Sequence, residues 1–197
     1  MDRLRRECPW DREQTHRSLA RYLLEETYET LEAIESGDSA HLREELGDLL
    51  LQVVFHARIA DENDVETGGF DIDDVAGGIV DKLVRRHPHV FSDLDVSSAD
   101  EVATNWETIK TAEKGRTSVL DGVPMAMPAL ALADKVLGRA ERVGVVEPFR
   151  VVEPVEAPLG DRLLALVAEA RADGLDAEQE LRGAVRRLVA AVRADET

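Results

Sequence analysis

Four acidic residues stand in two equally spaced pairs on either side of a short break in the chain. Glu26 and Glu29 are three residues apart, and Glu45 and Asp48 repeat that spacing beyond Gly37. Residues three apart share one face of a helix, because successive residues turn by about 100°. Two helices joined by a tight turn would bring the pairs face to face. Four converging carboxylates repel one another and favour a cation, and oxygen ligands suit Mg²⁺, with Mn²⁺ as a substitute.

The two helices that must position these pairs are both expected to bury apolar side chains. The first is predicted from about Thr15 to Ser36, and Glu26 falls inside its apolar stripe of Leu19, Leu23, Thr30, Ala33 and Ile34. The second is predicted from about Ser39 to Glu62 and is apolar nearly all round, which is typical of a buried helix. One polar strip follows it, formed by Glu45, Asp48, Gln52 and His56. Carboxylates against a core cost several kcal/mol unless they are paired or bind metal.

The alternative for any one of these carboxylates is ordinary solvation, since most helical glutamates face water. That interpretation suits Glu25, Glu32, Glu35 and Glu44. It suits the two pairs less well, because both lie on or beside apolar stripes.

A cationic face interrupts an otherwise acidic chain. Lys82, Arg85 and Arg86 fall at i, i+3 and i+4 near the end of a helix predicted from about Asp71, which Pro88 prevents from continuing. Guanidinium and ammonium groups bind phosphate well. The alternative is a solvated helix end stabilised by the helix dipole.

Composition limits the class of protein and its partners. The chain has 197 residues, 44% of them apolar, and a formal charge of −17. That charge argues against a nucleic-acid polymer as partner. The single cysteine, Cys8, cannot form an internal disulfide, which favours a reducing cytoplasm. No apolar run approaches the ~20 residues of a membrane span, so we expect a soluble protein that does not bind membranes.

The other elements read along the chain are also helices. Residues 1–14 are expected to be an irregular entry segment. Further helices are predicted from Ser98 to about Lys114 and from Pro128 to Arg142. Residues 143–158, with three prolines, are predicted to be a linker, followed by amphipathic helices over 159–172 and 176–194.

An internal repeat links the two ends of the chain. Residues 46–58 align without gaps on residues 159–171, with eight of the thirteen positions identical. The second copy has lost its acidic set, because Pro158 stands in place of Glu45 and no equivalent of the Glu26 helix precedes it. Asp161 is the one carboxylate that this copy keeps.

The acidic motifs and their flanks resemble the MazG family of nucleoside triphosphate pyrophosphohydrolases. The motif Glu25-Glu26-x-x-Glu29 is followed by Glu45-x-x-Asp48, with Cys8-Pro9-Trp10-Asp11 before it and Arg86-His87-Pro88-His89 after it. The resemblance covers about residues 4–143. It implies an all-α helical bundle, Mg²⁺ dependence, and hydrolysis of NTPs and dNTPs to monophosphate and pyrophosphate in the cleaning of nucleotide pools.

The resemblance also implies roles for individual residues. The metal would be held by Glu26, Glu29, Glu45 and Asp48. The phosphates would be bound by Lys82 and Arg86, with Arg85 beside them. The nucleotide would be bound by Trp106 with Lys110. The resemblance implies a homodimer as well. The chain would then comprise a catalytic domain over 1–142, a linker over 143–158 and a degenerate second copy over 159–197. Trp106 could instead be core. Two other interpretations are open: a catalytically dead nucleotide-binding or dimerisation protein, and an enzyme restricted to one damaged nucleotide.

Overall fold

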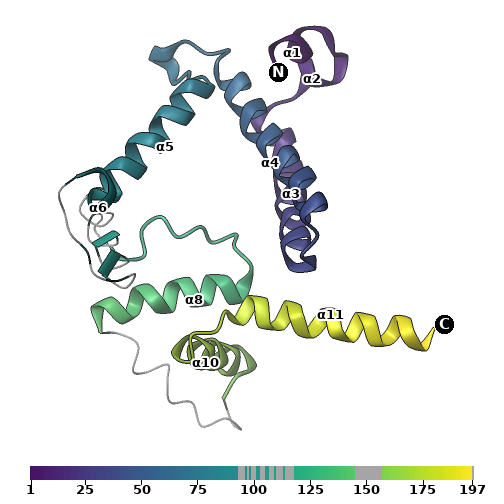
Figure 1. The fold of residues 1–197 in the computed structure, drawn as a ribbon, viewed down its shortest axis with the longest axis vertical. Helices are drawn as coiled ribbons and strands as arrows, with labels where there is room; N and C mark the ends of the chain where they lie inside the picture. The colour runs from purple at the N-terminus through teal and green to yellow at the C-terminus, as the bar shows by residue number, and fades with distance from the viewer. Residues whose placement is uncertain are drawn as a thin grey trace. The chain divides into compact units, whose positions relative to one another are not determined.

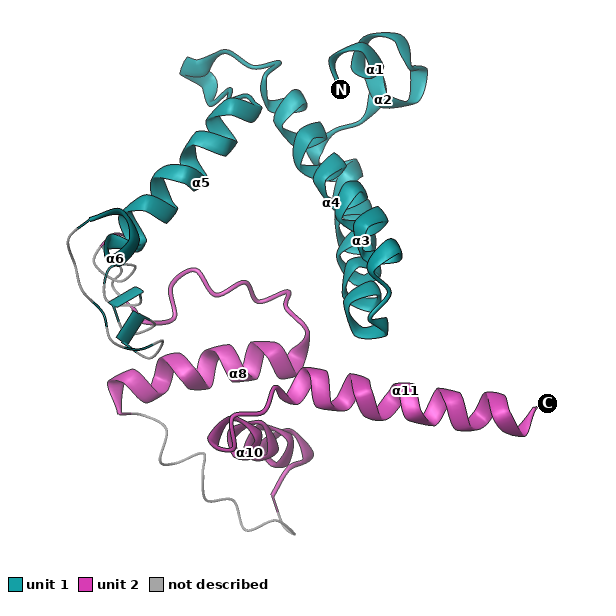
Figure 2. Ribbon diagram, in the orientation of Figure 1, with its two compact units in different colours: residues 1–110 teal, residues 111–197 magenta. Residues whose placement is uncertain are grey.

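The structure is a computed structural model that describes residues 1–92, 118–144 and 157–196, with residues 96, 98, 101, 102, 105, 106, 109 and 113 between them. Throughout these residues the regular structure is helical, and none of them forms a strand. The all-α class is therefore confirmed. Contacts divide the chain into two compact units, residues 1–110 and residues 111–197 (Figure 2). No helix among the described residues is long and apolar enough to cross a membrane.

The N-terminal segment is helical, so the prediction of an irregular entry was wrong. It forms α1 (Asp2–Glu7) and α2 (Pro9–Glu13), with Pro9 in the first turn of α2, where its missing N–H leaves no bond unmade. Arg5 holds both in place: its guanidinium donates to the carbonyl oxygens of Asp11 and Gln14 and pairs with Glu62 at 2.7 Å. A long-range ion pair of this kind leaves no periodic signal in the sequence.

The centre of the first unit is a hairpin of two long helices, α3 (His16–Ser36) and α4 (Ser39–Ala60), which lie side by side (Figure 1). The Thr15 side chain caps α3 by accepting from the backbone N–H of Ser18. Gly37 ends α3 with a φ of 72°, a left-handed conformation that glycine adopts without strain. Asp38 then caps α4, which leaves a two-residue turn and makes the helices antiparallel.

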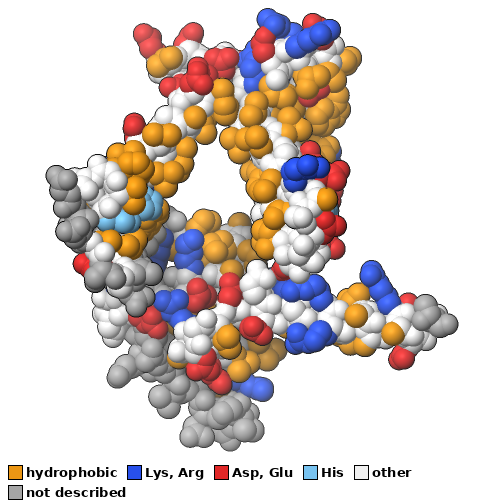
Figure 3. Space-filling model, viewed as in Figure 1, with side chains coloured by type: hydrophobic (Ala, Val, Ile, Leu, Met, Phe, Trp, Pro, Cys, Tyr) orange, Lys and Arg blue, Asp and Glu red, His pale blue; other side chains and the backbone are white. Residues whose placement is uncertain are grey.

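Among the described residues of the first unit only one face of α4 is covered, although the sequence predicts a buried helix. Its buried face contributes Phe55 and Ile59 to a core with Leu19 of α3. Other large apolar residues of the hairpin are exposed, Leu50 by 58%, and with it Leu46, Leu51, Val53, Leu24 and Ile34. Apolar side chains are accordingly visible on the molecular surface (Figure 3). An apolar stripe of this size on a long helix needs a cover that this chain's described residues do not supply.

The first unit continues through η1 (Val65–Thr67) into α5 (Ile72–Arg86) and the short α6 (Pro88–Phe91). Asp71 and Asp74 form a capping box at the start of α5, as their spacing predicts. Pro88 ends α5 and begins α6. The predicted helix from Ser98 lies mostly outside the described residues, and so does Lys110.

The second unit contains α8 (Ala129–Ala140), η2 (Glu141–Val143), α10 (Leu159–Ala172) and α11 (Ala177–Asp195). Its core joins Leu137 of α8 to Val167 and Ala168 of α10. Arg171 of α10 pairs with Asp134 at 2.9 Å and Glu141 at 3.0 Å. Residues 145–156 of the predicted linker lie outside the described residues.

The two sequence repeats bury and expose matching positions. Val54 and Phe55 of α4 correspond to Val167 and Ala168 of α10, and Phe55, Val167 and Ala168 are buried while Val54 is partly buried. Leu46, Leu50 and Val53 correspond to Leu159, Leu163 and Leu166, and all six are exposed. The repeat thus keeps the packing pattern of α4 after its acidic residues are lost.

Candidate functional site

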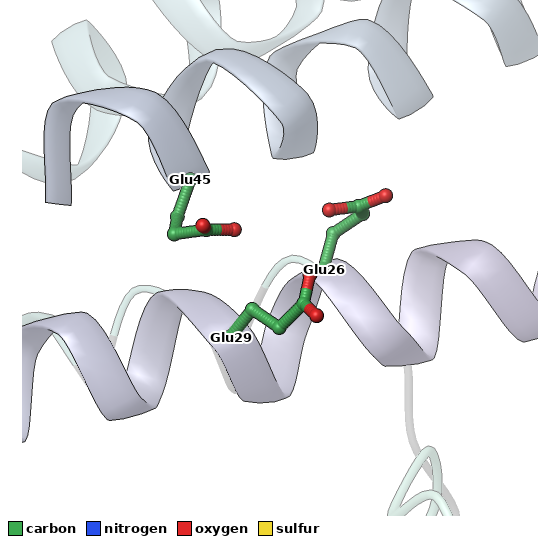
Figure 4. A group of neighbouring side chains, drawn as sticks. All are labelled: Glu26, Glu29 and Glu45. Carbon is green, nitrogen blue, oxygen red and sulfur yellow. The ribbon is translucent and has the colours of Figure 1, made fainter. Parts of the chain in front are cut away.

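Three carboxylates from α3 and α4 converge in the middle of the hairpin. One oxygen each of Glu26, Glu29 and Glu45 lies within 4.8 Å of the others, and Figure 4 shows the three side chains meeting between the helices. The helix spacing puts Glu26 and Glu29 one turn apart on α3, and the tight turn sets Glu45 opposite them. Thr30 Oγ1 donates a long hydrogen bond of 3.5 Å to the carbonyl oxygen of Glu45, which connects the two helices at the site.

Burial and the neighbouring carboxylates raise the pKa of Glu26, the latter as expected for clustered negative charges. Burial raises the pKa of Glu26 above its ordinary value of 4.5, and the charges of Asp48, Glu29 and Glu45 raise it further. Asp48 is exposed on α4 and is not among the three residues whose oxygens meet within 4.8 Å. Its charge is nevertheless one of those that raise the pKa of Glu26.

Glu45 is the most enclosed member of the group. The residue is 8% exposed, and its Oε2 atom is buried without a hydrogen-bond partner in the structure. A buried carboxylate oxygen without a donor is costly unless a cation or water binds it. Converging carboxylates with an unmatched buried oxygen fit a hard divalent cation, and oxygen donors without cysteine or histidine suit Mg²⁺ or Mn²⁺.

One neighbour of the cluster was missed by sequence reasoning. His41 Nε2 lies 3.0 Å from Oε1 of Glu45, one turn earlier on α4. The i to i+4 spacing was visible in the sequence, but it also fits any exposed helix pair, so it pointed to nothing by itself.

The polar strip of α4 continues beyond the acidic pairs. Gln52 is 6% exposed and its Oε1 atom has no partner. His56 stacks on His16, with the two Nδ1 atoms 2.8 Å apart. Burial, followed by the charge of His16, lowers the pKa of His56. His56 therefore favours the neutral form and joins the start of α3 to α4.

The basic residues lie on α5, and the structure separates them by environment. Lys82 and Arg85 are exposed, whereas Arg86 is only 8% exposed. The Arg86 guanidinium carbon lies over the indole ring of Trp106, 5.5 Å from its centroid. Arg86 is therefore not part of a solvated helix end, and its guanidinium group lies against Trp106.

His87 belongs to a motif that carries the family resemblance, but the sequence assigned it no role. Its ring packs edge-on against Trp106 with centroids 4.8 Å apart. Its Nδ1 atom lies 2.7 Å from the carbonyl oxygen of Leu83, which can only accept, so Nδ1 carries the proton. Arg86 and His87 both lie against the indole ring.

Comparison with known proteins gives one consistent family. Residues 14–91, which span α3 to α6, match the MazG nucleotide pyrophosphohydrolase domain. The chain is 41% identical over 202 residues to the nucleoside triphosphate pyrophosphohydrolase/pyrophosphatase MazG of Thermotoga maritima, covering 92% of this chain and 76% of that protein.

Two further relatives are longer than this chain. It is 54% identical over 145 residues to the nucleoside triphosphate pyrophosphohydrolase of Mycobacterium tuberculosis, covering 74% of this chain and 44% of that one. It is 46% identical over 167 residues to the Escherichia coli K12 protein of the same name, covering 83% of this chain and 61% of that one. In both cases the chain spans less than two thirds of the relative. With the motif residues placed on one helical hairpin and these relatives matched over most of its length, the chain belongs to the MazG family of nucleotide pyrophosphohydrolases.

Proposed function

We propose that this protein is a Mg²⁺-dependent nucleoside triphosphate pyrophosphohydrolase that converts NTPs and dNTPs to monophosphate and pyrophosphate. The observation that carries the proposal is the meeting of Glu26, Glu29 and Glu45 within 4.8 Å, with Glu45 Oε2 buried and unmatched. The names of the relatives support the same reaction. Cleaning of the cytoplasmic nucleotide pool fits such an activity, and the free thiol of Cys8 suits a reducing compartment.

The mechanism follows from charge. A triphosphate brings about four negative charges to an acidic site, where Mg²⁺, when bound, neutralises phosphate oxygens and activates water for in-line attack. Glu26, Glu29, Glu45 and Asp48 would hold it. Lys82 and Arg85, exposed on α5, would bind the phosphate chain. Arg86 would also bind the phosphates, while its guanidinium group lies over the indole ring of Trp106.

Trp106 would receive the base. An indole stacks on any nucleobase, because every base has a π-face, which fits an enzyme that accepts several nucleotides. Lys110, four residues further along the sequence, is assigned to the nucleotide on the family resemblance.

The proposal is tested by identifying the products. Purified protein with Mg²⁺ and a panel of canonical and damaged NTPs should release monophosphate and pyrophosphate. The variant Glu45→Gln, which keeps the side-chain shape and loses the charge, is the control for contaminating phosphatases and should lose the activity. Diphosphate and orthophosphate as primary products would refute the reaction. Nucleotide binding without turnover would favour the catalytically dead alternative, and turnover of one damaged nucleotide alone would favour the restricted enzyme.

We also propose that the protein is a homodimer in which a second copy covers the exposed stripe of α4, namely Leu46, Leu50 and Val53. The stripe is too apolar to remain exposed, and a symmetric pairing of two such stripes is self-complementary. Leu50→Lys should yield a monomer by light scattering at micromolar concentration. Val65→Lys, which places the same charge on an exposed turn, should leave the dimer intact. A wild-type monomer would contradict the proposal.

We assign catalysis to residues 1–142 and regard residues 159–197 as a degenerate copy. Asp161 is exposed on α10, and the one candidate metal group among the described residues belongs to the first unit. The contacts place α8 with α10 and α11, which supports a packing role for that helix in the second unit.

A further inference from the structure

The imidazole of His41 is placed to orient the most buried carboxylate of the acidic cluster. The two side chains occupy successive turns of α4, and His41 Nε2 lies 3.0 Å from Glu45 Oε1. An ionised carboxylate can only accept hydrogen bonds, so the proton of this contact is on His41 Nε2. The bond forms with either a neutral or a charged imidazole.

The two oxygens of Glu45 are left in different situations by this contact. Oε1 accepts from His41, whereas Oε2 is buried and has no hydrogen-bond partner. The same carboxylate contributes one oxygen to the group with Glu26 and Glu29 (Figure 4). A donor on one oxygen restricts rotation of the carboxylate and fixes the direction of the other.

An ordinary exposed helix pair would have little effect, because solvent screens it and both side chains lose freedom. This pair differs in its burial. The Glu45 side chain is 10% exposed and the His41 side chain 39%. The accepting carboxylate is therefore shielded from solvent, and the donating imidazole lies nearer the surface. Hydrogen-bond partners that orient a metal ligand commonly change metal affinity by about 10- to 100-fold.

We propose that His41 is a positioning residue for the metal ligand Glu45: its Nε2–H holds Oε1, so that Oε2 is directed at the cation shared with Glu26 and Glu29. This inference rests on the proposed function, because it assumes that the cluster binds Mg²⁺ or Mn²⁺. His41 touches neither metal nor substrate and acts only through Glu45.

The test is direct measurement of Mn²⁺ affinity on the full-length protein, by calorimetry or by the electron paramagnetic resonance of free Mn²⁺. His41→Leu should weaken Mn²⁺ binding about tenfold. His41→Gln keeps an N–H donor of similar reach and should bind Mn²⁺ within a few-fold of wild type. Ala40→Leu, an uncharged change at the neighbouring exposed position, should bind as wild type does.

Activity gives a second measurement. The Mg²⁺ concentration for half-maximal rate should rise in His41→Leu while the rate at saturating Mg²⁺ stays near that of wild type. Equal Mn²⁺ affinity in His41→Leu and wild type would overturn the positioning role. Equal weakening in the leucine and glutamine variants would overturn it as well, since the donor would then be irrelevant. Absence of Mn²⁺ binding by the wild-type protein would instead refute the metal site itself.

Discussion

Replacing Asp48 with alanine is expected to abolish hydrolysis, whereas the same change at Asp161 should leave turnover within a few-fold of wild type. The two aspartates occupy equivalent positions of the internal repeat, both exposed on α4 and α10. Their surroundings differ. The charge of Asp48 acts on Glu26, beside Glu29 and Glu45, while Asp161 has Pro158 where Asp48 has Glu45.

The size of the expected difference follows from the number of ligands. Loss of one carboxylate from a shared site should lower kcat/KM by more than about a hundredfold, beyond what loss of an outer hydrogen-bond partner costs. Asp161 alone would offer a cation a single carboxylate, whereas three carboxylates converge in the first copy. The measurement is pyrophosphate release at saturating Mg²⁺, with circular dichroism to show that both variants are folded. Comparable losses in the two folded variants would show that the second copy is a working site.

The second expected result is that Glu26→Gln makes the metal-free protein more stable at neutral pH and removes its stabilisation by Mg²⁺. In the wild type, burial and the neighbouring carboxylates disfavour ionised Glu26. The glutamine removes that repulsion and also removes a ligand. A cation that binds only the folded state at about 100 times its Kd adds about 2.7 kcal/mol to the free energy of unfolding. Thermal melts in chelator and in Mg²⁺ measure both effects.

The contribution of Glu26 to the stability of the metal-free protein should decrease as the pH rises. The folded-state pKa of Glu26 lies above its ordinary value, so the folded state binds this proton more tightly than the unfolded state does. The contribution of Glu26 to stability is therefore fully present below its ordinary pKa and is lost as the pH rises through the raised one. In chelator, the advantage of Glu26→Gln should shrink as the pH falls towards 4.5. A variant that melts with the wild type in chelator and responds equally to Mg²⁺ would contradict the acidic metal site.

The sequence alone determined the local elements of this protein. The predicted bounds of α3, α4 and α5 agree with the structure to within a few residues. Residues next to the helix ends set these bounds: Thr15, Asp38 and Asp71 each accept bonds from the helix that follows. The spacing predicted that four carboxylates meet, because a two-residue turn makes α3 and α4 antiparallel. Glu26, Glu29 and Glu45 do meet, whereas Asp48 is not among the three whose oxygens lie within 4.8 Å. These features depend on neighbours close in sequence.

Only the tertiary structure decided which side chains are enclosed and by what. Periodicity indicated that α4 is apolar nearly all round, yet Leu50 is exposed, because the described residues of the first unit cover only one face of the helix. Arg86 was predicted to bind the phosphates, and only the structure shows that it is buried and lies against Trp106, twenty residues later. The hydrogen bond of His41 to Glu45 matters because Glu45 is buried, and burial is set by packing of α3 on α4. Such environments arise from contacts between distant segments, which no local pattern of residues specifies.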